Sequence, residues 1–347
     1  MHDDLIQLTD SGLYCAAGDF HIDPWQPVAR AVITHAHGDH ARRGSGAYLA
    51  ARDGERVLRT RLGDDAQIQA IAYGEPLMIG DVRVSLHPAG HILGSAQVRL
   101  ERAGQVWAVS GDYKTGADPT CAAFEPVRCH TFITESTFGL PIYRWRAQAA
   151  IFDEINGWWR ANQLAGKASL LFAYSLGKAQ RVLAGVDLTI GPIYTHGAVE
   201  RLVADYRASG VALPATTYAA AGLKADWSQA LIVAPPSAQG SPWMRRFGPL
   251  SAGFASGWMQ IRGARRRKAV DRGFALSDHA DWPGLLHAIA ATGAEQVWVT
   301  HGYSAVLARW LSEQGLAARA ISTHFEGEPD DTAEESAPAG DTAQERA

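Results

Sequence analysis

Short runs of β-branched and apolar residues, each bounded by turn residues, fill the first 135 positions of the chain. Four of these runs predict strands, at residues 31–34, 82–86, 96–100 and 106–110. From about residue 144 the pattern changes to segments with a helical period, which alternate with continuous apolar runs. Residues 147–161 repeat apolar side chains at Ile151, Ile155 and Trp159 and predict a helix, and residues 169–173 predict the buried strand that follows it.

The alternation of helices and strands continues toward the C-terminus. Helices are expected from about residues 178 and 198, and an irregular stretch rich in Gly, Pro and Ser follows at 214–265. After Gly273 the pattern predicts strand, helix (282–291), strand (297–300) and helix (303–315). We therefore expect an α/β protein in which one domain, made of 1–140 and 271–325, is interrupted by a second domain at 141–270.

The composition is that of a protein with a sizeable core, because 347 residues with 47% hydrophobic side chains can bury one large core or two ordinary ones. No apolar run reaches the roughly 18 residues of a membrane span, and the acidic N-terminus carries no visible secretory signal. The three cysteines, Cys15, Cys121 and Cys129, make neither a disulfide framework nor a Cys-x-x-Cys metal clip. This cysteine usage favours a reducing, cytoplasmic setting.

The negative charge of the chain is concentrated at its C-terminal end. Residues 326–347 contain eight acidic residues and one basic residue and show no apolar period, so we expect a disordered acidic tail. The other 325 residues carry a net charge of +3, against −4 for the whole chain. A slightly basic body permits a polyanionic substrate without demanding one.

Four side chains that can bind a metal lie within six residues, directly after the strand at 31–34. They are His35, His37, Asp39 and His40, in the sequence Thr-His-Ala-His-Gly-Asp-His. A loop that leaves a buried strand can aim two of these side chains at one centre while the other two turn toward a second, and a pair of metal ions needs that division. Three imidazoles and a carboxylate gathered with nothing to neutralise would be unfavourable. The segment therefore predicts a metal site.

Four further polar residues stand where predicted strands end or turn. His91 lies in a glycine-flanked turn, Asp112 follows the strand at 106–110, and His279 and His301 lie in the sequences Ser-Asp-His-Ala and Thr-His-Gly. Each has small neighbours that let a metal or a substrate approach. Any one of them alone would suit a capping or solvated role, but the whole set at strand ends extends the predicted metal site.

These residues resemble the motifs of a known family. The series from His35 to His40, followed by His91 and Asp112, is similar to motifs two to four of the metallo-β-lactamase fold. Glu135, His279 and His301 resemble motifs A, B and C of its nucleic-acid-processing branch, the β-CASP group. Segments 12–15, 18–20, 22–25, 256–259 and 271–274 look like the short bacterial ligase-associated DNA exonuclease type, also described as mRNA 3′-end processing factor-like. The resemblance runs from about residue 5 to 325, and it implies a metallo-β-lactamase αββα sandwich with an inserted α/β β-CASP domain at 141–270.

The resemblance also implies a set of metal ligands around two divalent ions. Zn²⁺ suits this imidazole and carboxylate set best, and Mn²⁺ would also be accepted. The ions would generate a hydroxide that attacks phosphorus. The implied ligands are His35, His37 and His91 for the first metal, Asp39, His40 and His301 for the second, and Asp112 as a bridge.

Catalytic and supporting roles follow from the same resemblance. His279 would protonate or steady the leaving oxygen and Glu135 would orient it, with Asp112 and Asp39 completing the catalytic set. An aspartate near the first strand would orient a metal-binding histidine. Asp19 and Asp23 both fit that role, and Asp23 is slightly preferred.

Two softer features could contact nucleic acid. Ser175 and Lys178 lie between a strand and a helix start, where free N–H groups and the ammonium could hold a phosphate, although Ser175 would equally suit an ordinary N-cap. A basic cluster precedes the His279 segment and is either a solvated face or a track for a strand backbone. This cluster consists of Arg262, Arg265, Arg266, Arg267 and Lys268.

The function that the resemblance implies is an exonuclease acting on single-stranded DNA, in DNA repair and in association with a DNA ligase or helicase. A ribonuclease of the same group, active in RNA 3′-end processing or decay, is the rival, because the motifs report phosphodiester chemistry and do not detect a 2′-hydroxyl. A small-molecule hydrolase of the same fold is disfavoured, because those enzymes lack the inserted domain and residues equivalent to Glu135 and His279. A scaffold protein is disfavoured because no expected ligand is missing.

Overall fold

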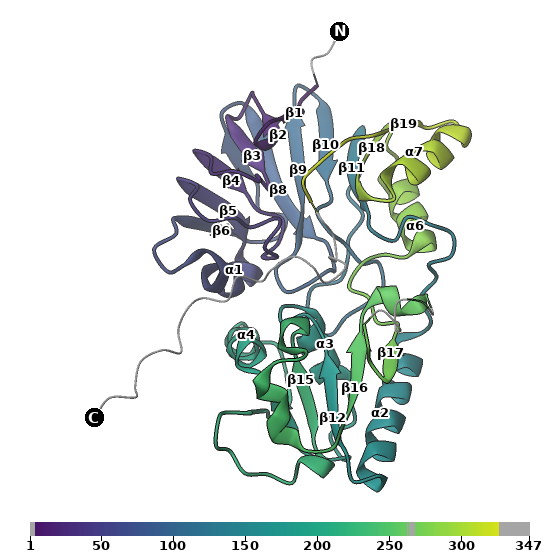
Figure 1. Cartoon of the computed structure of the whole chain (residues 1–347). Coiled ribbons are helices and arrows are strands. Elements are labelled where there is room, and N and C mark those ends of the chain that lie inside the picture. Colours follow the sequence, from purple (N-terminus) through teal and green to yellow (C-terminus); the bar gives the residue numbers. More distant parts are fainter. Residues whose placement is uncertain (1–3, 262, 264–267, 326–347) are drawn as a thin grey trace.

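Two sheets packed face to face form the upper half of the molecule in Figure 1, and a third sheet with its helices forms the lower half. This computed structural model describes residues 4–261, 263 and 268–325. The expected acidic tail at 326–347 lies outside the described residues.

The first sheet has six strands in sequential order: β1 (Gln7–Thr9), β2 (Gly12–Cys15), β3 (Phe20–Ile22), β4 (Arg30–Val32), β5 (Ala47–Ala51) and β6 (Ile68–Ile71). The second sheet has the order β19-β18-β11-β10-β9-β8-β7. Its strands are β7 (Leu77–Ile79), β8 (Val82–Pro88), β9 (Ala96–Arg102), β10 (Gln105–Val109), β11 (Thr131–Ser136), β18 (Gln296–Gly302) and β19 (Ala317–Ala320). Apolar side chains from both sheets, such as Leu13 and Val32 from the first and Val84 and Val98 from the second, form one buried core between them.

Helices cover the outer faces of this sandwich. α1 (Glu55–Leu62) follows the short turn η1 (Arg52–Gly54) and packs Val57 and Leu58 against the first sheet. α6 (Trp282–Thr292) and α7 (Ser304–Glu313) pack against the outer face of the second sheet. The helix–sheet–sheet–helix order confirms the expected αββα sandwich.

The third sheet has the order β14-β13-β15-β12-β16-β17, and all its neighbouring strands run parallel. Its central strand β12 is buried along its whole length, as expected for a parallel strand covered on both faces. The helices α2 (Gln148–Leu164), α3 (Lys178–Gly185) and α4 (Gly197–Ala208) pack on one face. The strands are β12 (Ala168–Phe172), β13 (Ile193–Thr195), β14 (Thr217–Tyr218), β15 (Leu231–Ala234), β16 (Leu250–Ala255) and β17 (Arg272–Phe274), and the short turns between them are η2 (Trp227–Gln229), η3 (Pro236–Ala238), η4 (Pro242–Phe247) and η5 (Gly257–Gln260).

Two expectations about this region need adjustment. The stretch expected to be irregular at 214–265 contains β14, β15 and β16, and β15 and β16 pair with the central strand β12 on its two sides. β17 pairs with β16, although it lies beyond the expected boundary at 270. We therefore propose that the inserted unit extends to Phe274.

Among the described residues no helix combines the length and the apolar character that a membrane crossing requires. Cys15, Cys121 and Cys129 are all unpaired.

Candidate metal centre

The predicted ligands come together at one end of the sandwich, where strands of both sheets end. The loop after β4 carries the histidines from His35 to His40, the turn between β8 and β9 carries His91, and the loop after β10 carries Asp112. His301 lies near the end of β18. Gly111 allows this approach, because a Cβ there would lie 2.6 Å from the Thr34 side chain.

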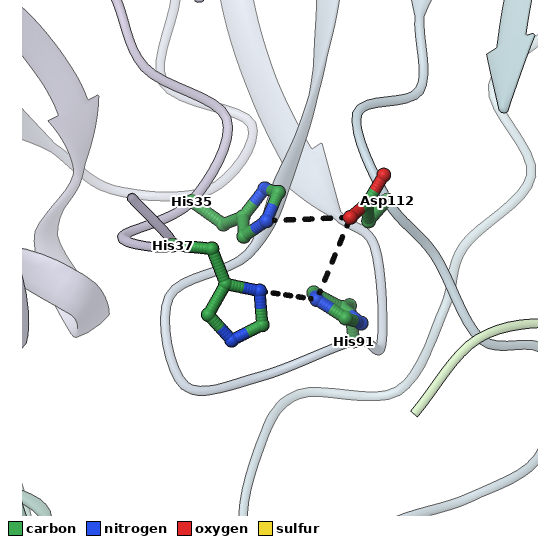
Figure 2. A group of neighbouring side chains, drawn as sticks. All are labelled: His35, His37, His91 and Asp112. Atoms are coloured by element: carbon green, nitrogen blue, oxygen red, sulfur yellow. Dashed lines mark hydrogen bonds and ion pairs between the residues drawn. The ribbon is translucent and has the colours of Figure 1, made fainter. Parts of the chain in front are cut away.

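The first expected ligand set forms a compact group. The ligand atoms of His35, His37, His91 and Asp112 all lie within 4.8 Å of one another, and Figure 2 shows the three rings around the carboxylate. The Asp112 Oδ2 lies 3.5 Å from His35 Nε2 and 3.9 Å from His91 Nε2. The His91 Nε2 and the His37 Nδ1 are 3.1 Å apart.

The second expected set approaches the same carboxylate and is connected in pairs. His40 Nε2 lies 3.6 Å from Asp112 Oδ2 and 3.6 Å from Asp39 Oδ2. His301 Nε2 lies 3.0 Å from the other oxygen of Asp112, Oδ1. Asp112 therefore stands between the two sets, in the position that a bridging ligand requires.

Three of the histidines are held on the ring nitrogen that faces away from the centre. His91 Nδ1 donates to the Asp278 carbonyl at 2.9 Å, and His37 Nε2 donates to the Leu176 carbonyl at 3.2 Å. A carbonyl can only accept, so these nitrogens carry the hydrogen. The opposite nitrogens, which face the centre, present lone pairs when the rings are neutral. His40 is held in the same way, because its Nδ1 lies 2.8 Å from a carboxylate oxygen.

The other two histidines are held by threonines that sequence reasoning missed. His35 and His301 each follow a threonine, and each ring Nδ1 lies 3.0 Å from that threonine's hydroxyl. The Thr34 hydroxyl donates to Asp23, and the Thr300 hydroxyl donates to a main-chain carbonyl, so each hydroxyl accepts from the ring. Both Nε2 atoms are thereby left as acceptors. The Thr-His pair that occurs twice at strand ends is the sequence signal for this arrangement.

These contacts leave hydrogen-bond acceptor atoms facing one another at the centre. Such an arrangement is suited to binding cations. The facing nitrogens of His37 and His91, and the facing atoms of His301 and Asp112, would repel without a positive charge between them. Four buried atoms of the centre have no hydrogen-bond partner among the described residues: His35 Nε2, His40 Nε2, His301 Nε2 and Asp112 Oδ1. Buried polar atoms without partners are rare in proteins. The residues of this centre therefore fit divalent metal ions.

The pKa values of the histidines agree with that fit. Burial lowers the pKa of His35 and of His91 well below the ordinary value, so both rings are neutral and can act as ligands. Burial also disfavours the protonated form of His40, but the carboxylates of Asp39 and Asp112 outweigh it and raise its pKa to about 10. A positive charge is thus favoured at this position, and a metal ion in place of the proton would supply it.

Of the two aspartates left open by the sequence, only Asp23 reaches the metal ligands. Asp23 is buried, its Oδ2 lies 2.8 Å from His40 Nδ1, and its Oδ1 accepts from the main-chain N–H of Thr34 at 2.7 Å. The side chain of Asp19 is 66% exposed and accepts from the Tyr14 hydroxyl. We therefore propose Asp23 for the orienting role.

We expect Asp23→Asn to weaken the binding of the ion held by His40. An amide is uncharged and can donate to the ring, so it no longer fixes the nitrogen toward the centre, and such changes cost about 10- to 100-fold in metal affinity. Titration of metal-free protein with Zn²⁺ against a chelator measures the effect. Asp19→Asn is the matched control, and an equal loss in both variants would contradict the assignment.

His279 and Glu135 form a buried pair beside the centre. The His279 Nδ1 lies 3.0 Å from both carboxylate oxygens of Glu135. Glu135 is held in turn by the main-chain N–H of Tyr113 at 2.7 Å and by the Thr137 hydroxyl. Burial lowers the pKa of His279, but the charges of Glu135 and Asp112 outweigh it and the pKa is raised. The ring is therefore oriented through its Nδ1.

The expected phosphate contacts at the start of α3 are not available to a substrate. Lys178 is completely buried and lies 3.4 Å from a carboxylate oxygen of Asp278. Ser175 is also buried, and the residue that caps α3 is Gly177. The expectation that Ser175 and Lys178 hold a phosphate is corrected accordingly, because a tertiary partner neutralises the lysine.

The basic cluster is described at one position only. Arg262, Arg265, Arg266 and Arg267 lie outside the described residues. Lys268 is half-buried, with its ammonium over the ring of Phe254, 5.5 Å from the ring centroid.

Comparison with known proteins finds several relatives in sequence. No protein-family model matches the chain. A probable DNA ligase of Opitutus terrae is 30% identical over 313 residues, which cover 89% of this chain and 30% of that protein. The endoribonuclease YSH1 of Gibberella zeae is 32% identical over 126 residues, covering 35% of this chain and 15% of that protein. An RNase J-like protein of Methanocaldococcus jannaschii is 25% identical over 237 residues, covering 57% of this chain and 54% of that protein.

The chain spans less than two thirds of the length of each of these relatives. Among solved structures, a protein of unknown function from Enterococcus faecalis has a TM-score of 0.55 at 11% identity, covering 86% of this chain and 80% of that one, which supports the fold alone. The relatives share the β-CASP form of the metallo-β-lactamase fold, in agreement with the sandwich, the inserted third sheet and the ligand set. The relatives, the fold and the candidate ligand set all fit the β-CASP group of the metallo-β-lactamase fold.

Proposed function

We propose that the chain is a metal-dependent phosphodiesterase that shortens single-stranded DNA from an end. The observation that carries this proposal is the group of five histidines gathered around Asp112, with the His279–Glu135 pair beside it. A binuclear centre of this kind is suited to hydrolysis of a phosphodiester, where charge develops on the phosphoryl oxygens.

We propose that two divalent ions are held, Zn²⁺ by preference and Mn²⁺ as the alternative, because imidazole and carboxylate ligands suit both. When bound, the ions would lower the pKa of water and stabilise negative charge on the phosphoryl oxygens. The ligands would be His35, His37 and His91 on one side of Asp112, and Asp39, His40 and His301 on the other.

The residues around the centre position the reacting groups. His279 carries the proton that its Nε2 gives to the leaving oxygen. Glu135 accepts from His279 Nδ1, which keeps the ring oriented and stabilises its positive charge while the proton is held. Asp112 keeps the ligands of both ions facing one another, because its two oxygens lie toward different histidines.

DNA is favoured as the substrate because the relative that aligns with 89% of this chain is named a probable DNA ligase. A nuclease that trims an end and a ligase that joins ends act on the same intermediates. We therefore propose that the chain works in DNA repair in the cytoplasm, in association with a DNA ligase or helicase. RNA is the second candidate, because other relatives are named endoribonuclease and RNase J-like protein.

Matched oligonucleotides test the substrate. We expect a linear single-stranded DNA with an end label to shorten stepwise, and a closed single-stranded DNA circle of the same sequence to survive, because an exonuclease needs an end. Gel electrophoresis of the products after addition of Zn²⁺ or Mn²⁺ measures both, with a chelator as the control.

Two outcomes of this experiment would change the proposal. Faster loss of an RNA of the same sequence would assign the chain to the ribonucleases of the group. Cutting of the circle would show an endonuclease.

A further inference from the structure

Four charged side chains are buried where α3 meets the sandwich. Lys178 and Arg181 come from α3, and Asp118 and Asp278 come from loops of the sandwich region; all four side chains are at most 4% exposed. Arg181 Nε lies 3.1 Å from Asp118, and Arg181 Nη1 lies 3.1 Å from Asp278 Oδ1. Lys178 Nζ lies 3.4 Å from Asp278 Oδ2.

The stability of the fold does not explain this network well. Removing four charges from water costs about as much as their mutual attraction returns, so apolar side chains of similar size would serve stability equally well. The residues that the network holds in place therefore explain it better than stability does. Arg181 also donates to the main-chain carbonyl of Ser277, so it holds two consecutive residues directly before His279.

That short main-chain segment touches the metal centre. The Asp278 carbonyl accepts from His91 Nδ1 at 2.9 Å, and the Ser277 hydroxyl accepts from the main-chain N–H of His279 at 3.1 Å. A second contact comes from the residues before α3, where the Leu176 carbonyl accepts from His37 Nε2 at 3.2 Å. Two of the three histidines of the first metal group are thus held by carbonyls that the inserted unit supplies or fixes.

We propose that the inserted unit is part of the first metal site, with Arg181 as a positioning residue that sets the orientation of His91 through Asp278. The proposal rests on the proposed function only in taking the ion to be the metal of that function. Partners that hold the outer nitrogen of a metal-binding histidine fix its tautomer and ring angle, and they tune the affinity of the site. Lys178 completes the arrangement by holding the second carboxylate oxygen of Asp278.

The experiment uses the full chain and a charge-balanced variant, Arg181→Met with Asp118→Asn. This variant removes one positive and one negative charge and keeps the Lys178–Asp278 pair, so the net buried charge is unchanged. Metal-free protein is titrated with Zn²⁺ against a competing chelator. We expect one of the two bound ions to be held about 10- to 100-fold more weakly, as for other changes to the partners of metal ligands. The ion held by Asp39, His40 and His301 should bind as in the parent chain.

A spectroscopic measurement separates positioning from a general loss of stability. Nuclear magnetic resonance of ¹⁵N-labelled histidine should show a protected hydrogen on His91 Nδ1 in the metal-free parent chain and loss of that protection in the variant. Arg160→Met is the matched control, because it removes an exposed arginine–aspartate pair of the same inserted unit, Arg160 with Asp187 at 2.5 Å. The control should leave both the Zn²⁺ affinity and the His91 signal unchanged.

The outcomes are distinguishable. A folded charge-balanced variant that binds both ions with parental affinity and keeps the His91 signal overturns the proposal. If that variant does not fold, Arg181→Lys replaces it, since it keeps the charge but loses the planar fork that reaches Ser277 and Asp278 together; unchanged Zn²⁺ affinity in this variant would equally overturn it. A parent chain that binds no Zn²⁺ would instead refute the proposed function, while the His91 signal would still test the network.

Discussion

Replacing Asp112 with alanine will reduce hydrolysis to background and release bound metal. Its two carboxylate oxygens lie toward ligands of both groups, His35 at 3.5 Å and His301 at 3.0 Å. Loss of that carboxylate leaves the facing histidines without the negative charge that draws cations between them. We expect the metal content to fall from about two ions per chain to less than one. Elemental analysis of the purified protein and a cleavage assay on labelled DNA measure the two effects.

A surface aspartate provides the control for this variant. Asp81 belongs to the same sandwich and pairs with Arg102 at 2.8 Å, and its side chain is 59% exposed. Asp81→Ala should keep both metal content and activity, since exposed pairs contribute little. Full activity in Asp112→Ala would refute the proposed centre.

Replacing His279 with alanine will separate proton transfer from metal binding. The His279 ring is oriented by Glu135 and is not among the seven proposed ligands, so both ions should remain bound. Activity should fall about 10²- to 10⁴-fold, the loss expected when a general acid is removed. Metal content and cleavage rate are measured on the same preparation.

The His301→Ala variant is the comparison for His279→Ala, because His301 is a proposed metal ligand and His279 is not. His301 Nε2 faces Asp112 directly, so its removal should cost one metal ion along with the activity. If His279→Ala lost metal and His301→Ala did not, the two roles would have to be exchanged.

The sequence alone predicts the candidate metal site because the signals of this site are local. The ligands follow strands or interrupt turns, and strand ends of two packed sheets meet at one edge. The pattern therefore predicts that His35, His91 and Asp112 belong to one site without knowledge of the topology. In the structure their ligand atoms lie within 4.8 Å of one another. The partners that fix the rings were missed, although the repeated Thr-His pair, Thr34 and Thr300 each before a histidine, was visible.

Features that depend on distant partners could not be predicted. The sequence predicts that Lys178 could hold a phosphate at a helix start, and only the fold shows that Asp278 neutralises it within the protein. The pattern does not predict the strand β15, because this strand is only four residues long and stands in a stretch rich in Gly, Pro and Ser. Pairing with strands on both sides makes it a central strand, and that pairing is a property of the whole sheet.

The position of β18 in the second sheet has a consequence for the protein during its synthesis. β18 pairs in parallel with β11, and it brings His301 opposite Asp112 from the far end of the described sequence. A chain emerging from the ribosome exposes the loop with His35 early, but it lacks His279 until the inserted unit has been translated, and it lacks His301 until α6 has followed. Pairing between strands so distant in sequence is also slow compared with local folding. A nascent chain thus carries an incomplete candidate centre, and the proposed nuclease cannot attack nucleic acid until β18 has been translated and has paired with β11.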